Sequence, residues 1–414
     1  MNSQPKKRYL NLYFQVHQPK RLGQFSFFDI GTTRDYFDDG LNQLVMRRVS
    51  QDCYQPTNLL LLKLFNRFPN LRVTFSISGS ALKQMETFSP ATLESFRMLA
   101  ATGKVEFLAE TYYHSLACLI SREEFNEQVG MHVNKIHQLM GVVPSVFRNT
   151  ELIYSDAIGK LADDLGFKGI FADGIEKILG ERSPNFLYAH PDRNLKVFLR
   201  NYRLSDDISF RFMQKKWGAW PLTPRKYLAW LEKMPDREEF INLSLDYETF
   251  GEHLKYETGI FKFLEGLLSA AAKHKNITMV TPSEAIQLLE PADTVKVPEN
   301  ISWADKERNL SAWLGNDMQR DAFITLKKLE IPVKNINNAD LLNTWRYLQT
   351  SDHYYYMSTK NGDDGNIHNY FSPYPSPYEA FMNYMNVLTD FSLRIERQLP
   401  QRRQEEKEHP EMTA

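Results

Sequence analysis

The residues best suited to chemistry lie in the run Asn242–His253, where a short apolar segment leads directly into three acids and a histidine. The alternation of apolar residues just before this point predicts a buried strand. Asp246 and Glu248 follow at alternate positions, so both carboxylates can face one cavity, and Gly251 suits a turn with a positive φ. Paired acids at the carboxyl end of a strand predict acid–base chemistry, with His253 as a further candidate for binding substrate.

A second acidic position follows another apolar segment. Residues 145–149 read as a strand and lead into Arg148, Asn149 and Glu151 before an amphipathic helix begins. Each segment alone has a plainer interpretation. The acids after residue 245 suit a solvated loop, and Glu151 suits the first turn of a helix, where the macrodipole favours an acid. Considered together, the two segments indicate a pair of carboxylates at one site.

Five segments of the chain resemble, in order, the five signature regions of glycoside hydrolase family 57. The residues of the last three segments resemble those of the α-amylase-type subgroup. The resemblance covers nearly all of residues 8–395. Five ordered motifs are a specific signal, whereas HQP alone would be weak. The segments are QVHQP at 15–19, GKVEFLAE at 103–110, FRNTELIY at 147–154, LDYETFGEH at 245–253 and ERNLSAWLG at 307–315.

The resemblance implies a retaining glycosidase with Glu151 as the nucleophile and Asp246 as the general acid/base. Cleavage through an oxocarbenium-like transition state needs one ionised carboxylate below the anomeric carbon and one protonated carboxyl beside the leaving oxygen. The two groups must therefore be ionised differently. We expect the charge of Glu248 to favour the protonated form of Asp246, and Arg148 or His17 to keep Glu151 ionised.

The same resemblance implies a set of substrate-binding residues. His17, Glu106 and Glu248 match positions that line the subsite for the sugar to be cleaved, and Trp313 matches an aromatic wall for the sugar chain. Gln15 departs from the pattern H-x-H-Q-P, in which many family members carry a first histidine, and we count it as a substrate contact of the amylase subgroup.

The implied substrate is an α-glucan or malto-oligosaccharide, and the implied reaction is hydrolysis of α-1,4-glucosidic bonds in starch, glycogen or maltodextrin. A 4-α-glucanotransferase shares the covalent intermediate and differs only in the acceptor that resolves it. A catalytically silent glucan-binding protein is a third interpretation, which the presence of Glu151 and Asp246 disfavours.

We expect no cofactor and no metal. The carboxylate mechanism needs neither, and the ten histidines contain no H-x-x-x-H pair. His132 and His137 lie five positions apart, hence on different faces of a helix, so a packed or solvated helix explains them better than a metal site. His114 follows the third expected strand and suits the cleft or the core equally well.

Composition is that of a globular chain. The 414 residues are 42% hydrophobic and 24% charged, and the net charge of −1 favours a neutral substrate over nucleic acid or an anionic membrane. Cys53 and Cys118 form no disulfide framework, which favours a reducing compartment. Without a signal-peptide or membrane-span pattern, we predict a cytoplasmic protein. The sequence leaves the oligomeric state open.

Strand and helix patterns alternate over the first part of the chain, which is typical of parallel βα units. The family resemblance implies that these strands form a distorted (β/α)7 barrel, an incomplete TIM barrel. Ile277–Val280 is either an eighth strand or the approach to a helix capped by Thr281 or Ser283. The seven expected strands are 9–16, 71–78, 104–109, 145–149, 168–172, 195–200 and 240–246.

After residue 295 the sequence contains no further strand patterns, and helical patterns follow. We therefore predict a barrel domain at 1–295, a C-terminal α-helical domain at 296–400, and a disordered tail at 401–414, where the chain is charged and nearly free of apolar residues.

Overall fold

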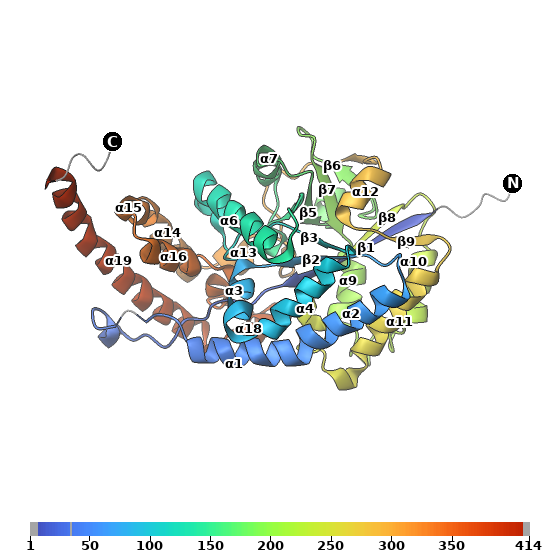
Figure 1. The fold of residues 1–414 in the computed structure, drawn as a ribbon, viewed down its shortest axis with the longest axis horizontal. Helices are drawn as coiled ribbons and strands as arrows, with labels where there is room; N and C mark the ends of the chain where they lie inside the picture. The colour runs from blue at the N-terminus through green and yellow to red at the C-terminus, as the bar shows by residue number, and fades with distance from the viewer. Residues whose placement is uncertain (1–6, 34, 409–414) are drawn as a thin grey trace. The chain divides into compact units, whose positions relative to one another are not determined.

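The computed structural model describes residues 7–33 and 35–408 and divides the chain into two compact units (Figure 1). The first unit runs to residue 18 and includes 43–112 and 125–303. The second includes 19–42, 113–124 and everything described from 304 onward. The boundary predicted at 295/296 therefore differs from the structure in two ways: residues 296–303 belong to the barrel unit, and two earlier segments belong to the helical one.

Both differences have a structural cause. Tyr154 and Ile301 exchange backbone hydrogen bonds of 3.0 and 2.9 Å, which tie the chain after residue 296 to the loop that follows a barrel strand. In the second unit, Ser115 pairs with Thr350 in an antiparallel bridge, so the segment 113–124 belongs with helices more than 200 positions further along the chain.

In the part of the chain that the structure describes, seven parallel strands form the barrel, as the sequence predicts. Two sheets supply them, with β8, β1, β2 and β3 paired in one and β4, β5 and β7 in the other. A parallel bridge between Ala109 and Phe147 joins the sheets on one side. On the other side, the Asn201 amide donates to the Asn242 carbonyl at 2.8 Å. The strands are β1 Arg8–Val16, β2 Val73–Ile77, β3 Val105–Phe107, β4 Val146–Arg148, β5 Gly169–Asp173, β7 Lys196–Arg200 and β8 Phe240–Asp246.

Three short strands lie outside this ring: β6 Leu187–Ala189, β9 Ile277–Met279 and β10 Asp293–Thr294. β9 pairs with the first residues of β1, and Thr281 then caps α12 (Pro282–Leu288) through a capping box with Glu284. Both expectations for this region therefore hold, because a three-residue strand is followed at once by a capped helix.

Helices surround the strands of the first unit, and α2, α11 and α10 follow one another in contact along one side (Figure 1). Their apolar faces pack on the sheet; α11, for example, buries seven side chains. The helices wholly or mostly in this unit are α1 Asp39–Val49, the π-helical segment η2 Ser50–Tyr54, α2 Gln55–Arg67, α3 Gly79–Phe88, α4 Pro90–Ala101, α6 Arg122–Met140, α7 Asp156–Asp164, α8 Glu176–Leu179, α9 Tyr202–Ser209, α10 Pro224–Glu232, α11 Ile260–Lys273 and α12, with 3₁₀ turns η3 Thr150–Leu152, η4 Tyr247–Thr249 and η5 Tyr256–Thr258.

The interior of the barrel changes from apolar to polar along the strands. Tyr13, Leu108, Val146 and Phe171 belong to one buried cluster in its lower and middle parts. Towards the carboxyl ends of the strands, the inward positions carry Gln15, Ser76, Glu110, Arg148, Asp173, Arg200 and Asp246. Buried polar groups are costly unless they are paired or functional, so this end of the barrel is where chemistry is expected.

The second unit is helical and has its own aromatic core, in which Trp345 and Trp313 are buried. Glu124 and Arg346 form a buried ion pair at 2.9 Å. Helix α19 extends to Glu408, so the tail predicted from 401 begins as helix, and its last six positions lie outside the described residues. The other elements are η1 Phe27–Asp29, α5 Ala117–Ile120, α13 Ser311–Leu314, α14 Asp317–Lys328, α15 Glu330–Ile336, α16 Ala339–Leu348, α17 Ser351–Tyr355, α18 Gly362–Phe371 and α19 Pro377–Glu408.

Candidate active site

Glu151 lies just beyond β4, at the carboxyl end of the barrel, in a strained turn. Its backbone has φ 58° and ψ 25°, and Leu152 follows with φ 50°. Left-handed conformations of non-glycine residues cost about 1–3 kcal/mol each and persist where surrounding structure enforces them. Here the Trp303 amide donates to the Glu151 carbonyl at 3.3 Å, and the Trp303 indole Nε1 donates to Glu151 Oε2 at 2.7 Å. The carboxylate is therefore oriented by a residue 152 positions away.

Arg148, on β4, has an unusual environment. It is fully buried, and none of its three guanidinium nitrogens has a hydrogen-bond partner among the residues that the structure describes. Its charged group lies 5.1 Å from the centre of the Trp303 ring, and that of Arg200 lies 5.5 Å from it. Arg148 or His17 was expected to keep Glu151 ionised, whereas the hydrogen bond to Glu151 Oε2 comes from Trp303.

Asp246 is the last residue of β8 and is half-buried. It pairs in register with Gln15 of β1, so the two side chains lie on the same side of the sheet. Gln15 accepts a hydrogen bond from the Tyr13 hydroxyl and donates one of 3.2 Å to Glu110 Oε1. Burial raises the pKa of Tyr13, and the charges of Glu110 and Asp246 raise it further while that of Arg148 lowers it. The charges of Glu110, Asp246 and Arg148 therefore all act on the Tyr13 hydroxyl.

Glu248 and His17 meet on the neighbouring side of the cleft. Glu248 Oε1 accepts from the Tyr54 hydroxyl and, at 3.4 Å, from the His17 amide, and His17 Nδ1 lies 2.7 Å from Ser78 Oγ. Burial raises the pKa of Glu248 to about 8, and the charge of Asp246 adds to the effect, while the Tyr54 hydrogen bond opposes it. The Glu248 carboxyl therefore favours its protonated form near neutral pH, in which it can donate a hydrogen bond, and it does not supply the negative charge that was expected to keep Asp246 protonated.

His253 follows Glu248 in a turn that only glycine permits. Gly251 has φ +121°, and a Cβ there would lie 1.9 Å from the Asp52 carbonyl oxygen. The His253 amide donates to the Glu248 carbonyl at 2.9 Å. Burial lowers the pKa of His253 to about 4 despite the opposing charge of Glu252, so its ring is neutral at pH 7.

Glu106, which was expected to line the subsite for the sugar, and Glu110 of the same motif have different surroundings. Glu106 accepts hydrogen bonds from the Ser283 amide at 2.8 Å and hydroxyl at 2.7 Å, at the start of α12. It is in register with Thr74 and, through it, with Tyr13, so Glu106 lies two residues below Gln15, towards the amino ends of the strands. Glu110 instead contacts Gln15 and accepts from Ser76 Oγ at 2.7 Å. The acid of this motif that lies beside the catalytic candidates is thus Glu110.

Trp313 and His114 both lie in the second unit. Trp313 is 1% exposed and packs 6.3 Å from the Tyr355 ring, so it is a core residue of that unit rather than an open face for stacking a sugar. His114 is also buried, with φ 49° and its carbonyl accepting from the Ser351 amide.

Three residues of the site were missed from the sequence. Glu110 could have been found, since it continues the inward alternation from Glu106 through Leu108 within the motif. Trp303 could not be found from the sequence, because nothing local to it indicates a contact with Glu151. Tyr54 lies in the π-helical segment η2, a conformation often found at functional sites and not predictable from the sequence pattern.

Residues 7–33 and 35–408 contain neither a metal-binding cluster nor a membrane-spanning helix. Within those ranges no three His, Cys, Asp or Glu side chains are grouped so as to hold a metal ion. None of the helices described there is long and apolar enough to cross a membrane. Cys53 and Cys118 are both free thiols.

Comparison with known proteins identifies the family. The model of glycosyl hydrolase family 57 matches residues 11–298. The chain is 46% identical over 395 residues to a Methanocaldococcus jannaschii protein named "Putative alpha-amylase", covering 92% of this chain and 84% of that one. It is 22% identical over 270 residues to an α-amylase of Pyrococcus abyssi, but spans only 38% of that protein's length.

Solved structures agree on the fold. The branching enzyme of this family from Thermococcus kodakaraensis matches with a TM-score of 0.69 at 13% identity, over 88% of this chain and 87% of that one. The 4-α-glucanotransferase of Thermococcus litoralis matches with a TM-score of 0.66 at 17% identity, over 84% of this chain and 56% of that one. With the barrel, the ordered motifs and the family model in agreement, the chain belongs to glycosyl hydrolase family 57.

Proposed function

We propose that the protein is a retaining α-glucan-active glycosidase of the α-amylase type, which hydrolyses α-1,4-glucosidic bonds. The observation that carries the proposal is that Asp246 ends β8 and Glu151 follows the end of β4, both at the carboxyl ends of barrel strands, and that Trp303 orients Glu151. Family membership and the α-amylase names of the relatives support the substrate class.

In the proposed reaction, Glu151 attacks the anomeric carbon while Asp246 gives its proton to the leaving glycosidic oxygen. One C–O bond breaks and a glycosyl ester of Glu151 forms. Asp246, now a carboxylate, removes a proton from water, and the resulting hydroxide equivalent displaces Glu151 from the anomeric carbon. Two inversions give net retention of configuration.

The neighbouring groups have supporting roles in this proposal. Glu248 in its protonated form and His17 would donate hydrogen bonds to the sugar without adding a second anion beside Glu151. Gln15 and Glu110 would bind hydroxyls on the other side of Asp246. A cytoplasmic location, which two free cysteines suit, stays part of the proposal.

Incubation with maltoheptaose tests the function. Hydrolysis predicts new reducing ends in proportion to bonds cleaved. A redistribution of chain lengths with no gain in reducing ends would identify a 4-α-glucanotransferase, and binding without either product would identify a silent glucan-binding protein. Loss of reducing-end release in both Glu151→Gln and Asp246→Asn would assign the activity to this site.

Small nucleophiles separate the two roles. In Glu151→Ala, azide should attack an activated α-glucosyl donor from the face opposite the bond and give the inverted product. In Asp246→Ala, the glycosyl ester still forms from a donor whose leaving group needs no proton, and azide should then give the retained product. The opposite stereochemistry in both variants would exchange the assignments.

A further inference from the structure

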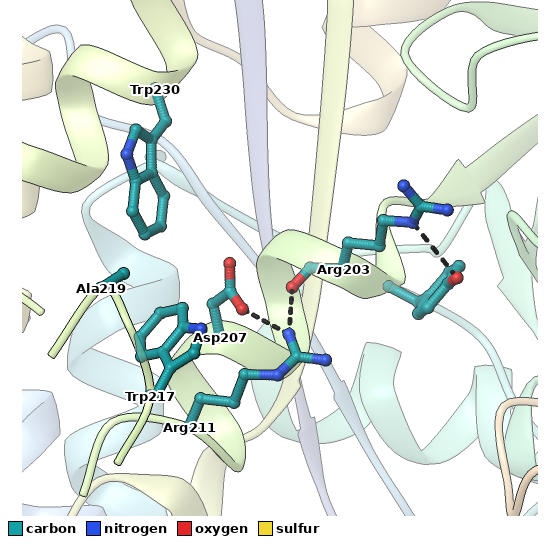
Figure 2. A pocket seen from close by; sticks show the side chains of 7 residues that line it. Arg203, Asp207, Arg211, Trp217, Ala219 and Trp230 are labelled. Atoms are coloured by element: carbon teal, nitrogen blue, oxygen red, sulfur yellow. Dashed lines mark hydrogen bonds and ion pairs between the residues drawn. The ribbon is translucent and has the colours of Figure 1, made fainter. Parts of the chain in front are cut away.

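A pocket of about 470 Å³ lies against α9 and α10 in the first unit (Figure 2). It is an open depression rather than an enclosed cavity, and its volume leaves room for a small ligand. Two indoles, an ion pair and a further arginine and tyrosine line it, and none of them belongs to the catalytic set. The lining residues are Tyr202, Arg203, Asp207, Arg211, Trp217, Ala219 and Trp230.

One side of the pocket is a corner made by Trp217 and Trp230, as Figure 2 shows. Their ring centres are 6.0 Å apart and their planes meet at 75°. Trp230 also packs 5.8 Å from Tyr227, which is fully buried and donates through its hydroxyl to the Leu204 carbonyl at 3.0 Å. The corner is therefore backed by the protein core, so little entropy is lost when a ligand stacks against it.

The opposite side is polar, and its charges cancel. Arg211 Nη1 donates to Asp207 and, at 3.4 Å, to the Arg203 carbonyl, while Arg203 Nη2 bonds Glu176 at 2.7 Å. Each guanidinium is thus paired with a carboxylate, which leaves no excess positive charge to attract a phosphate or nucleotide. Within the described residues, Arg211 Nε and Nη2 make no protein hydrogen bond and remain available as donors.

An indole corner facing a neutral set of planar hydrogen-bonding groups matches the chemistry of a pyranose. The C–H groups of one sugar face pack on an aromatic ring, and the hydroxyls at the ring edge need both donors and acceptors. Arg211 offers donors and Asp207 an acceptor in the same pocket. A neutral sugar therefore fits both sides, whereas an anion or a purely apolar ligand fits only one.

None of the catalytic candidates lines the pocket, and its lining residues on α9 lie on the face of the helix away from β8. Arg203 and Asp207 lie four positions apart on one face of α9, and Arg211 follows at the same interval just after the helix. On the other face, Ser205 Oγ accepts from the Ser244 amide of β8 at 3.1 Å, so that face packs on the barrel. Asp246 ends the same strand, and the pocket and β8 contact different faces of α9.

We propose that this pocket is a second α-glucan-binding site, which holds glucosyl units of a long chain without cleaving them. The identity of the sugar rests on the function proposed above, whereas the sugar-binding chemistry rests on the pocket alone. Such a site raises the local concentration of a polymer near the cleft and has no effect on substrates too short to occupy both.

Trp217→Ala is the test, with Trp217→Phe as the conservative variant and Phe210→Ala as the matched control. Phe210 is 55% exposed in the same connecting segment and does not line the pocket. We expect Trp217→Ala to weaken retention on a glycogen-containing native gel about tenfold, the effect of losing about 1.4 kcal/mol of aromatic contact. Phe210→Ala should be retained like wild type, and Trp217→Phe should fall between them.

Turnover of a short chromogenic α-maltoside separates this site from the cleft. Trp217→Ala should match wild type in kcat/KM on the maltoside while its KM for amylose rises. Unchanged retention of Trp217→Ala on glycogen would overturn the second site. So would an equal loss of kcat/KM on the maltoside and on amylose. If wild type cleaves no glucan, the proposed function fails, and Trp217-dependent retention of glycogen would still support the pocket. Absence of retention by wild type would overturn it.

Discussion

The raised pKa of Glu248 gives a quantitative prediction about stability. Burial and the charge of Asp246 raise it from an ordinary 4.5 to about 8, so the folded protein holds this proton more tightly than the unfolded chain does. The stabilising contribution is therefore complete below about pH 4.5 and is lost as pH rises through about 8. At about 1.4 kcal/mol for each pH unit, the full range corresponds to roughly 5 kcal/mol.

Glu248→Gln removes the titration and keeps a neutral side chain of nearly the same shape. The free energy of unfolding, measured by urea denaturation from pH 5 to pH 9, should rise in the variant relative to wild type by about 4 kcal/mol between pH 5 and pH 8, and then level off. Tyr54→Phe should raise the pH at which this stabilisation is lost, because the Tyr54 hydroxyl stabilises the ionised form of Glu248.

The matched control is Glu299→Gln, which removes an exposed carboxylate paired with Lys177 at 3.0 Å and should reproduce the wild-type curve. The raised pKa of Glu248 would be refuted if the free energies of unfolding of Glu248→Gln and wild type differed by the same amount from pH 5 to pH 9. Such a constant difference would mean that the folded protein holds Glu248 in the same ionisation state as the unfolded chain.

Three further predictions concern the catalytic groups. Trp303→Phe removes the indole donor to Glu151, and because a hydrogen bond to a charged group is worth about 1.5–3 kcal/mol, kcat should fall roughly 10- to 150-fold in initial-rate assays. Arg148→Met should keep or raise the melting temperature, since it removes a buried cation without hydrogen bonds, while kcat falls at least about tenfold; full activity would exclude an electrostatic role. Exhaustive chelation should leave turnover of maltoheptaose unchanged, and a loss that zinc reverses would contradict the carboxylate mechanism.

Much of the barrel could be predicted because a local sequence pattern marks each of its strands. Each strand is a short apolar run bounded by polar residues, and all seven expected ranges overlap the observed strands. Asp246 and Glu151 were selected from the ordered family motifs, because the acids of either segment alone also suit a solvated loop or the first turn of a helix. The Gly251 turn was also visible, because a positive φ beside a crowded backbone requires glycine.

The sequence by itself determined the strands, the chemical types at their carboxyl ends and the family. Only the tertiary structure decided which of two inward acids, Glu106 or Glu110, lies at the polar end of the barrel, because a period of two specifies the face of a strand but not the depth in the closed barrel. It also brought Trp303 to Glu151 across 152 positions and assigned residues 19–42 to the helical unit. Such pairings depend on how the whole chain closes on itself, and no local pattern encodes them.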